Sequence, residues 1–249
     1  MLAQMAKTIL PAPTYRRLRA WHNRPAGVRW GSLRRLNPVS RVFGYDRGTP
    51  IDRYYIDQFL NEHRQDIRGR VLEIAEPIYT RRFGDDRVTQ ADVLHTQPGD
   101  PQATLVGDLT TGQGIPRDAF DCIILTQTLG FIFDVPQALR GVAQALKPGG
   151  VALATCAGIS QISRYDMDRW GDFWRFTSRA AERLFTQAFA PGLPGQVQVQ
   201  TYGNVLAATA FLQGLACHEL TPTELNTRDR DYELLLGIRA VRATGDVHD

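Results

Sequence analysis

Short apolar runs recur along the chain and alternate with stretches in which apolar residues have helical spacing. The runs lie at residues 70–74, 87–92, 103–108, 121–126 and 151–155. Their length and their β-branched residues predict short, buried parallel strands. Strands that alternate with helices over short links predict an α/β fold with a doubly wound, mostly parallel sheet and helices on both faces.

Capping signals place several of the helices. Thr49-Pro50-Ile51-Asp52 predicts a helix start with threonine as the cap and proline at the first position, and this helix should continue to about Asp66. Asp134 to Gln137 predicts another start, and that helix should stop at the Lys147-Pro-Gly-Gly150 turn. After an aromatic, charged stretch at 159–178, we expect helices at 180–189 and 205–215 and strands at 196–201 and 232–241.

Charge divides the chain near residue 48. Residues 1–48 hold ten Lys/Arg and one acid, a local +9, whereas the rest holds nineteen and twenty-five, a local −6. We therefore predict a basic, aromatic-rich N-terminal arm at 1–48 and a globular domain at 49–249. We expect Trp21, Trp30, Phe43 and Tyr45 to pack on the domain.

The arm has several possible partners. Its excess of positive charge suits an anionic membrane surface or a phosphate-bearing acceptor. A solvated extension with aromatic anchors remains equally open. Nucleic acid is the weaker alternative, because no recognised nucleic-acid-binding module accompanies the charge.

Cysteine and histidine usage bears on the compartment. The three cysteines Cys122, Cys156 and Cys217 have no CxxC spacing, which indicates reduced thiols in a reducing compartment. The N-terminal apolar run is too short for a secretory signal and no stretch is apolar enough to span a bilayer, so we expect a cytoplasmic protein. The five histidines lack metal-ligand spacing, and we expect no metal site.

Acidic residues end three of the predicted strands in order: Glu73, Asp92 and Asp108. In an open parallel sheet, ligands bind outside the carboxyl ends of the strands. In nucleotide-binding sheets the first turn faces the ligand and an acid after the second strand takes ribose hydroxyls. The order of these acids therefore predicts a nucleotide-containing ligand.

With LKPGG at 146–150, this order resembles the class I S-adenosylmethionine-dependent methyltransferases, over about Thr49 to Val241. The segments GYDRGTPIDRYYI, YTRRFG, LTQTL and ISRYDMDRWGDFWRFTS resemble more closely a type 11-like bacterial subgroup that often accompanies glycan biosynthesis. The resemblance implies a Rossmann-like methyltransferase sheet and S-adenosylmethionine as the cofactor. It further implies O-methylation of a sugar or a glycan-linked small molecule.

The resemblance also implies a set of cofactor-binding residues. Glu73 would hold the cofactor loop, Asp92 would bind ribose hydroxyls, and Asp108 would lie at the adenine edge. The full predicted set is Glu73, Ala75, Tyr79, Asp92, Val93, Asp108, Leu109, Thr126 and Gln127. Thr126 and Gln127 end the fourth strand, where cofactor and acceptor would meet.

The aromatic, charged stretch is the predicted acceptor site. Its flat rings and guanidinium groups suit a sugar, because sugar rings stack on aromatic faces and hydroxyls bond to charged groups. The predicted substrate-binding residues are Tyr165, Arg169, Trp170, Trp174 and Arg175. Transfer to a hydroxyl needs a base, for which Asp166, Asp168 and Asp172 are unranked candidates. The same stretch could instead be a salt-bridged lid.

One segment departs from the family pattern. Ala75-Glu76-Pro77 stands where these enzymes have a glycine-rich loop, and the spacing from Glu73 to Asp92 is about one helical turn short. Glycine lets the backbone approach a ligand closely and adopt torsions that a side chain disfavours. The loop could be rebuilt, with Tyr79 lying over the cofactor. The alternative is a catalytically silent, methyltransferase-like binding module.

Overall fold

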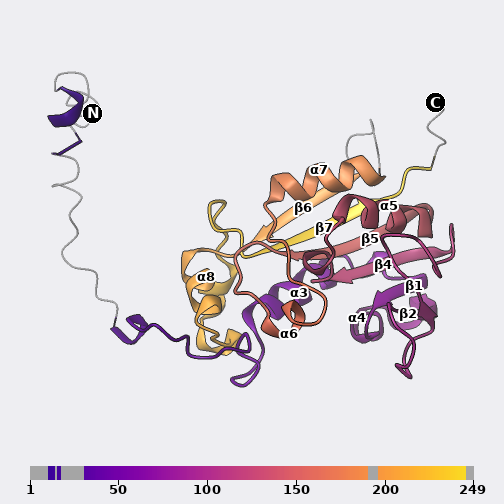
Figure 1. Cartoon of the computed structure of the whole chain (residues 1–249), viewed down its shortest axis with the longest axis horizontal. Helices are drawn as coiled ribbons and strands as arrows, with labels where there is room; N and C mark the ends of the chain where they lie inside the picture. Colours follow the sequence, from indigo (N-terminus) through magenta and orange to yellow (C-terminus); the bar gives the residue numbers. More distant parts are fainter. Residues whose placement is uncertain (1–10, 15, 18–30, 190–195, 245–249) are drawn as a thin grey trace. The chain divides into compact units, whose positions relative to one another are not determined.

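The computed structural model describes residues 11–14, 16–17, 31–189 and 196–244. The chain forms two units, Met1–Asn37 and Pro38–Asp249. The charge distribution predicted that the globular domain begins at Thr49. The larger unit instead begins at Pro38. Figure 1 traces both units along the chain.

Contacts made by residues 38–48 explain this boundary. The amides of Val39 and Ser40 donate to the Gln213 carbonyl, at 2.8 and 3.0 Å. The ring of Phe43 packs against Phe211 with centroids 6.0 Å apart, and Arg47 Nε donates to Glu219 Oε2 at 2.9 Å. Residues 38–48 are thus part of the folded unit. Tyr45 accepts a hydrogen bond from Arg53, whereas Trp21 and Trp30 lie outside the described residues.

A seven-stranded sheet forms the centre of this unit. Its strands are β1 (Gly69–Ile74), β2 (Val88–His95), β3 (Leu105–Val106), β4 (Phe120–Thr126), β5 (Leu146–Ala157), β6 (Val197–Tyr202) and β7 (Leu235–Val241). The spatial order is β3-β2-β1-β4-β5-β7-β6. Strands β1 to β5 are parallel, and β7 is antiparallel to β5 and β6. The predicted doubly wound, mostly parallel sheet is confirmed.

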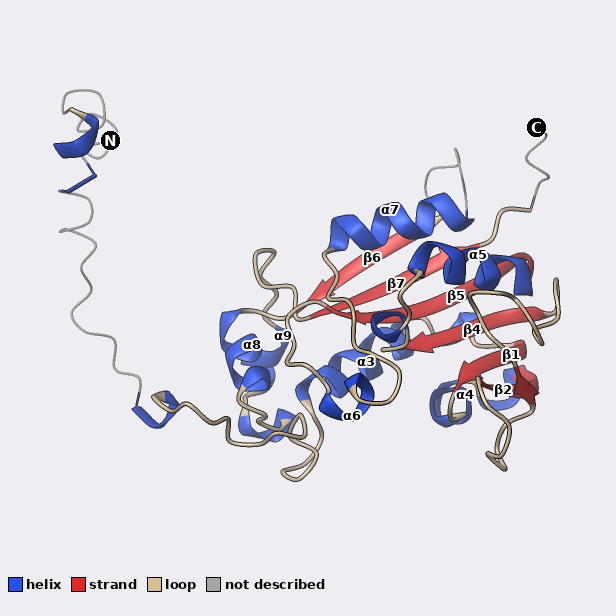
Figure 2. Ribbon diagram, viewed as in Figure 1, coloured by secondary structure: helices blue, strands red, loops and turns tan. Residues whose placement is uncertain are grey.

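Helices cover both faces of the sheet (Figure 2). The α-helices that the structure describes in this unit are α3 (Ile51–Glu62), α4 (Ile78–Phe83), α5 (Val135–Ala145), α6 (Arg164–Met167), α7 (Ser178–Phe189), α8 (Val205–Leu212) and α9 (Pro222–Asn226). Leu125 of β4 joins α5 and α7 in one buried cluster, and Ile124 joins α3 and α8 in the other. Neighbouring residues of β4 thus serve opposite cores, because successive side chains of a strand point to opposite faces.

The predicted Thr49 cap is wrong, and the predicted stop before Lys147 leads at once into a strand. Pro50 is the N-cap of α3 and no side chain caps this helix, whereas the Thr49 carbonyl accepts the amide of Cys217 at 2.8 Å. Helix α5 ends at Ala145, and Leu146 already pairs with Phe120 of β4. The Lys-Pro-Gly-Gly segment is therefore an irregular first part of β5.

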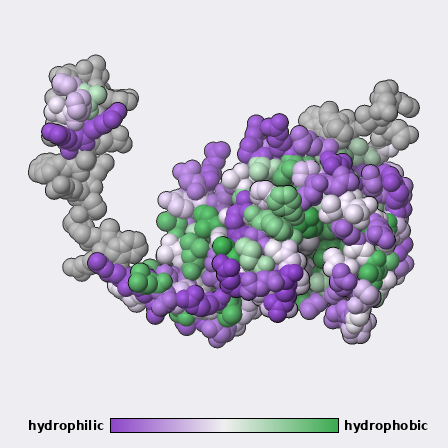
Figure 3. All heavy atoms as spheres, viewed as in Figure 1, coloured by the Kyte–Doolittle hydropathy of each residue, from purple (hydrophilic) through white to green (hydrophobic). Residues whose placement is uncertain are grey.

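On the face shown in Figure 3, hydrophobic residues are interspersed with hydrophilic ones. Among the described residues, none of the helices has the length and apolar character needed to cross a membrane.

Candidate active site

The strand order reverses between β1 and β4. From β1 the chain continues to β2 and β3 on one side, and from β4 it continues to β5 on the other. The loops that follow β1 and β4 therefore diverge at the carboxyl edge of the sheet. Such a switch point is where open α/β sheets bind their ligands.

Glu73 organises the loop after β1. Only 2% of Glu73 is exposed, and its two carboxylate oxygens accept the backbone amides of Tyr79 and Thr80 at 3.0 and 2.7 Å. Burial raises the pKa of the carboxyl group, and the two amide bonds partly oppose that rise. Glu73 thus ties the start of α4 to the end of β1 and fixes the path of the intervening loop.

Two non-glycine residues after these strands adopt left-handed backbone conformations. Ala75, after β1, has φ +69°, and Gln127, after β4, has φ +52°. Side chains disfavour this region, and such conformations cluster at functional sites. The loop after β1 therefore keeps a torsion that glycine would adopt without strain, although alanine occupies the position.

The second strand ends at His95, so the prediction that it ends at Asp92 is wrong. His95 Nε2 lies 2.6 Å from the Ala75 carbonyl oxygen and 3.9 Å from Asp100 Oδ2. The ring thus contacts the loop after β1 from the end of the second strand.

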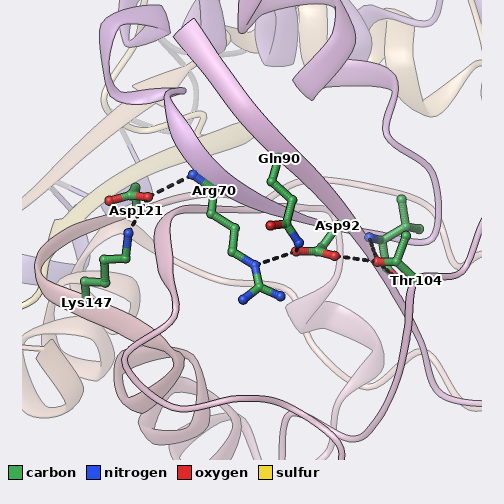
Figure 4. Close-up of polar contacts among 7 residues, drawn as sticks. Arg70, Gln90, Asp92, Thr104, Asp121 and Lys147 are labelled. Atoms are coloured by element: carbon green, nitrogen blue, oxygen red, sulfur yellow. Dashed lines mark hydrogen bonds and ion pairs between the residues drawn. The ribbon is translucent and has the colours of Figure 1, made fainter.

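Asp92 lies inside β2 and is 5% exposed (Figure 4). Its Oδ2 accepts from Arg70 Nε at 2.7 Å and from Gln90 Nε2 at 3.0 Å. Its Oδ1 accepts from Thr104 Oγ1 at 2.9 Å. Both carboxylate oxygens are occupied by protein groups. The geometry therefore favours a structural role over the predicted ribose contact.

The other predicted cofactor residues divide into edge and core positions. Asp108 is exposed just after β3, and its Oδ1 accepts the amide of Thr110 at 2.7 Å. Val93 and Leu109 are buried in the apolar interior. The hydroxyl of Tyr79 lies 3.4 Å from Arg53 Nη1 of α3, and its ring stacks on Phe83. Tyr79 of α4 thus packs against α3, and its position over the cofactor stays a prediction.

A cavity of about 880 Å³ opens beside the end of β4. Thr126 and Gln127 line it at the sheet edge, together with a few residues of other elements and with three longer segments. These are the segment from Pro38 to Tyr45, the start of α3, and the stretch from Ser160 to Arg175. Of the predicted acceptor residues, the cavity includes Tyr165, Asp166, Asp172, Trp174 and Arg175, whereas the exposed Asp168, Arg169 and Trp170 are not among its lining residues.

The acids of the predicted acceptor stretch are not equivalent. Asp172 accepts from Arg175 Nη1 and Nη2 at 2.5 and 2.8 Å and from the amide of Ser163 at 2.9 Å. Burial works against ionisation, but the Arg175 and Ser163 bonds outweigh it and lower the pKa of Asp172. Asp166 accepts the Ser163 hydroxyl at 2.6 Å. Asp172 is thus firmly held as an ion and is a weak base.

Sequence reasoning missed the wall formed by the start of α3. Asp52 and Arg53 line the cavity, and Arg53 Nε donates to the Tyr45 hydroxyl at 2.7 Å. Asp52 is 8% exposed, and its Oδ1 has no hydrogen-bond partner among the described residues. The only available signal was an acid in the first helical turn, which helix capping already explained.

Comparison with known proteins identifies the family. A family model described as "Methyltransferase domain" matches residues 33–189. The chain belongs to this methyltransferase-domain family. No curated protein sequence matches the chain.

Solved structures agree on the fold. An N-methyltransferase, NodS from Bradyrhizobium japonicum WM9, in complex with S-adenosyl-L-homocysteine, is 15% identical with a TM-score of 0.50 and covers 82% of this chain and 94% of its own. A SAM-dependent methyltransferase from Archaeoglobus fulgidus is 9% identical with a TM-score of 0.50 and covers 76% and 94%. These likenesses confirm the expected Rossmann-like methyltransferase fold.

The residues at the sheet edge fit S-adenosylmethionine, the cofactor expected for this fold and family. Ala75 holds the left-handed torsion that the loop needs, and Glu73 fixes that loop. Asp108, Gln127 and His95 supply polar groups at the ends of β3, β4 and β2. These groups suit the polar parts of the cofactor, although the amides of Ala75 and Glu76 are already bonded within the protein.

Proposed function

We propose that this protein is an S-adenosylmethionine-dependent methyltransferase that binds its acceptor in the cavity beside β4. The observation that supports this proposal most directly is that Thr126 and Gln127 lie both at the carboxyl edge of the sheet and in the cavity wall. A ligand at the switch point and a ligand in the cavity would meet there. The cofactor would supply a methyl group on a positively charged sulfur.

Particular residues would hold each ligand. The backbone of 75–77, fixed by Glu73, would hold the amino-acid end of the cofactor, and Asp108 would face its adenine. His95 would face the ribose in place of an acid. The cavity would hold the acceptor with its reacting atom toward Gln127, and the aromatic residues at its rim would limit water entry.

We propose O-methylation of a sugar or a glycan-linked small molecule. Trp174 and Tyr165 are 40% and 63% exposed and line the cavity, which leaves aromatic faces available for ring stacking. Arg164, Asp166 and Gln161 line it as well and can bond to hydroxyl groups. An amine acceptor is the main competing chemistry, because one fold neighbour is an N-methyltransferase.

A catalytically silent binding module is the second candidate function. The amides of Ala75 and Glu76 donate to the carbonyls of Leu94 and Ile74 at 3.1 and 2.9 Å, and residue 77 is a proline. His95 closes on the Ala75 carbonyl as well. These contacts leave the loop few free donors for a ligand.

Calorimetric titration with S-adenosylhomocysteine distinguishes the two functions. We expect saturable heat and a rise in melting temperature for the enzyme, because a ligand that binds only the folded state stabilises it. Asp108→Asn should weaken binding, whereas Glu182→Gln on the exposed side of α7 should not. Absence of heat and of a thermal shift at millimolar ligand would favour the silent module.

The acceptor class needs a second assay. Protein with methyl-labelled S-adenosylmethionine would be incubated with nucleotide sugars, simple glycosides and small amines. We expect label in hydroxylated sugars. Label confined to amines would contradict the sugar proposal and leave the methyltransferase proposal intact.

A further inference from the structure

Asp52 differs from the other acids that line the cavity. It is the second residue of α3 and is 8% exposed, yet its Oδ1 is buried without a hydrogen-bond partner among the described residues. Native proteins pair almost all buried polar atoms, so an unpaired one calls for an explanation. Asp172, by contrast, has three bonds to protein groups.

A second unpaired atom belongs to the same cavity. Arg175 Nε is buried without a partner in the described part of the chain, although both of its terminal nitrogens are bonded. Two residues of the cavity wall thus hold one unused acceptor and one unused donor, each covered by protein atoms. A polyhydroxylated ligand that draws these side chains toward the cavity would satisfy both, because a hydroxyl group can donate and accept.

We propose that Asp52 contacts the acceptor and is the base for methyl transfer, an inference that rests on the proposed methyltransferase function. The Asp52 carboxylate, at the cavity wall, accepts a hydrogen bond from the reacting hydroxyl of the acceptor. As the hydroxyl oxygen bonds to the methyl carbon, its proton passes to Asp52. The electron pair of the broken carbon–sulfur bond stays on sulfur, and Asp52 later releases the proton to water.

The charge state of Asp52 agrees with this role. Burial raises its pKa, while the charge of Arg53 and the backbone amides of residues 52 and 53 partly oppose the rise. A carboxylate with a raised pKa is a better proton acceptor at neutral pH. The other titratable groups that line the cavity are Arg41, Tyr45, Arg53, Arg164, Tyr165, Asp166, Asp172 and Arg175, and those against α3 include Tyr79, Arg82 and Arg228.

Asp52→Asn tests the proposal through turnover. This variant keeps the shape and removes the base, so we expect kcat to fall by roughly a hundredfold or more. The affinity for S-adenosylhomocysteine should stay within about twofold, because Asp52 is not placed at the cofactor loop. The control is Asp57→Asn on the same helix, which loses an ion pair with Arg82 outside the cavity and should keep full kcat.

A stability measurement tests the same idea without an acceptor. A buried unpaired carboxylate costs stability, so Asp52→Asn should raise the melting temperature by roughly 2–4 °C at neutral pH. Because the folded pKa is raised, this cost is absent below the unfolded pKa and complete above the folded pKa. The difference between native protein and variant should therefore shrink toward zero as the pH falls.

The outcomes separate the two proposals. If neither protein binds S-adenosylhomocysteine, the methyltransferase function fails, whatever Asp52 does. If both bind it and Asp52→Asn keeps its kcat, or if the variant melts lower at neutral pH, Asp52 is not the base. A loss of kcat in Asp57→Asn equal to that in Asp52→Asn would also overturn the inference.

Discussion

Two regions of the molecule, the β1–β2 region and the cavity wall, each contain a buried aspartate, and the two differ in how many protein groups they bond to. In the β1–β2 region, Asp92 is 5% exposed and accepts hydrogen bonds from three side chains. In the cavity, Asp52 is 8% exposed and one of its oxygens has no partner among the described residues. Burial alone therefore does not separate these two acids. The number of protein partners does, and a carboxylate with fewer partners keeps more capacity to bind a ligand.

Removing the satisfied carboxylate should have the largest effect on stability. Asp92→Ala leaves Arg70, Gln90 and Thr104 without their partner, and breaking a buried pair costs about 3–5 kcal/mol. Arg70 is 29% exposed, so we expect about 3 kcal/mol, which lowers the melting temperature by roughly 10 °C. Thermal unfolding followed by circular dichroism measures this change.

The matched control is a surface pair. Glu182→Ala removes the partner of Arg179, and both side chains are more than half exposed. Such pairs contribute about 0–1 kcal/mol. Asp92→Ala protein that melts like the control but binds S-adenosylhomocysteine at least tenfold more weakly would restore the ribose role and reverse the comparison.

The sequence predicted the sheet better than it predicted the strand ends. Strands β1 and β4 lie within a residue of their apolar runs, because both faces of these strands are buried. The predicted end of β2 at Asp92 is wrong because an acid in an apolar run is typical of a strand end. Asp92 is bonded to Thr104, which lies twelve positions away in a loop, and no local pattern shows that contact.

The cavity was only half predictable. The aromatic, charged stretch contains side chains that suit an acceptor, and five of its eight predicted residues line the cavity. Another wall comes from Pro38 to Arg53. The sequence assigned these residues to the basic arm or to the start of a helix, so nothing in their pattern pointed to a binding site. Asp52 became visible as a candidate only through tertiary structure, which showed that its carboxylate lacks a partner.

A smaller effect is expected at the loop after β1. Ala75 has φ +69°, which costs a side chain about 1–2 kcal/mol, whereas glycine loses about 0.5–1 kcal/mol through added freedom when unfolded. Ala75→Gly should therefore stabilise the protein by about 0.5–1 kcal/mol, measured by urea denaturation. It should also strengthen S-adenosylhomocysteine binding if the loop holds the cofactor.

Ala91→Gly is the control for that substitution. Ala91 is an exposed residue of β2 without a positive φ, so glycine should only destabilise there. If Ala75→Gly destabilises the protein as much as Ala91→Gly does, the left-handed loop is not a source of strain. The β1–β2 region would then be relaxed throughout, and the strain at this edge would be confined to Gln127.

The smallest effect should follow from deleting residues 1–37. The unit from Pro38 to Asp249 has its own core, and its cavity is lined from Pro38 onward. We expect the melting temperature and S-adenosylhomocysteine affinity of the shortened chain to stay unchanged. Deleting residues 1–48 is the matched control, because it removes Phe43, Arg47 and one wall of the cavity and should lower both stability and activity.

If the basic arm recruits an anionic acceptor or membrane, the deletion of residues 1–37 should abolish salt-sensitive binding to anionic vesicles while leaving turnover of a soluble acceptor intact. Equal, salt-insensitive vesicle binding by the shortened and full chains would limit the arm to a solvated extension. An equal loss of turnover in both deletions would instead make the first 37 residues part of the acceptor site.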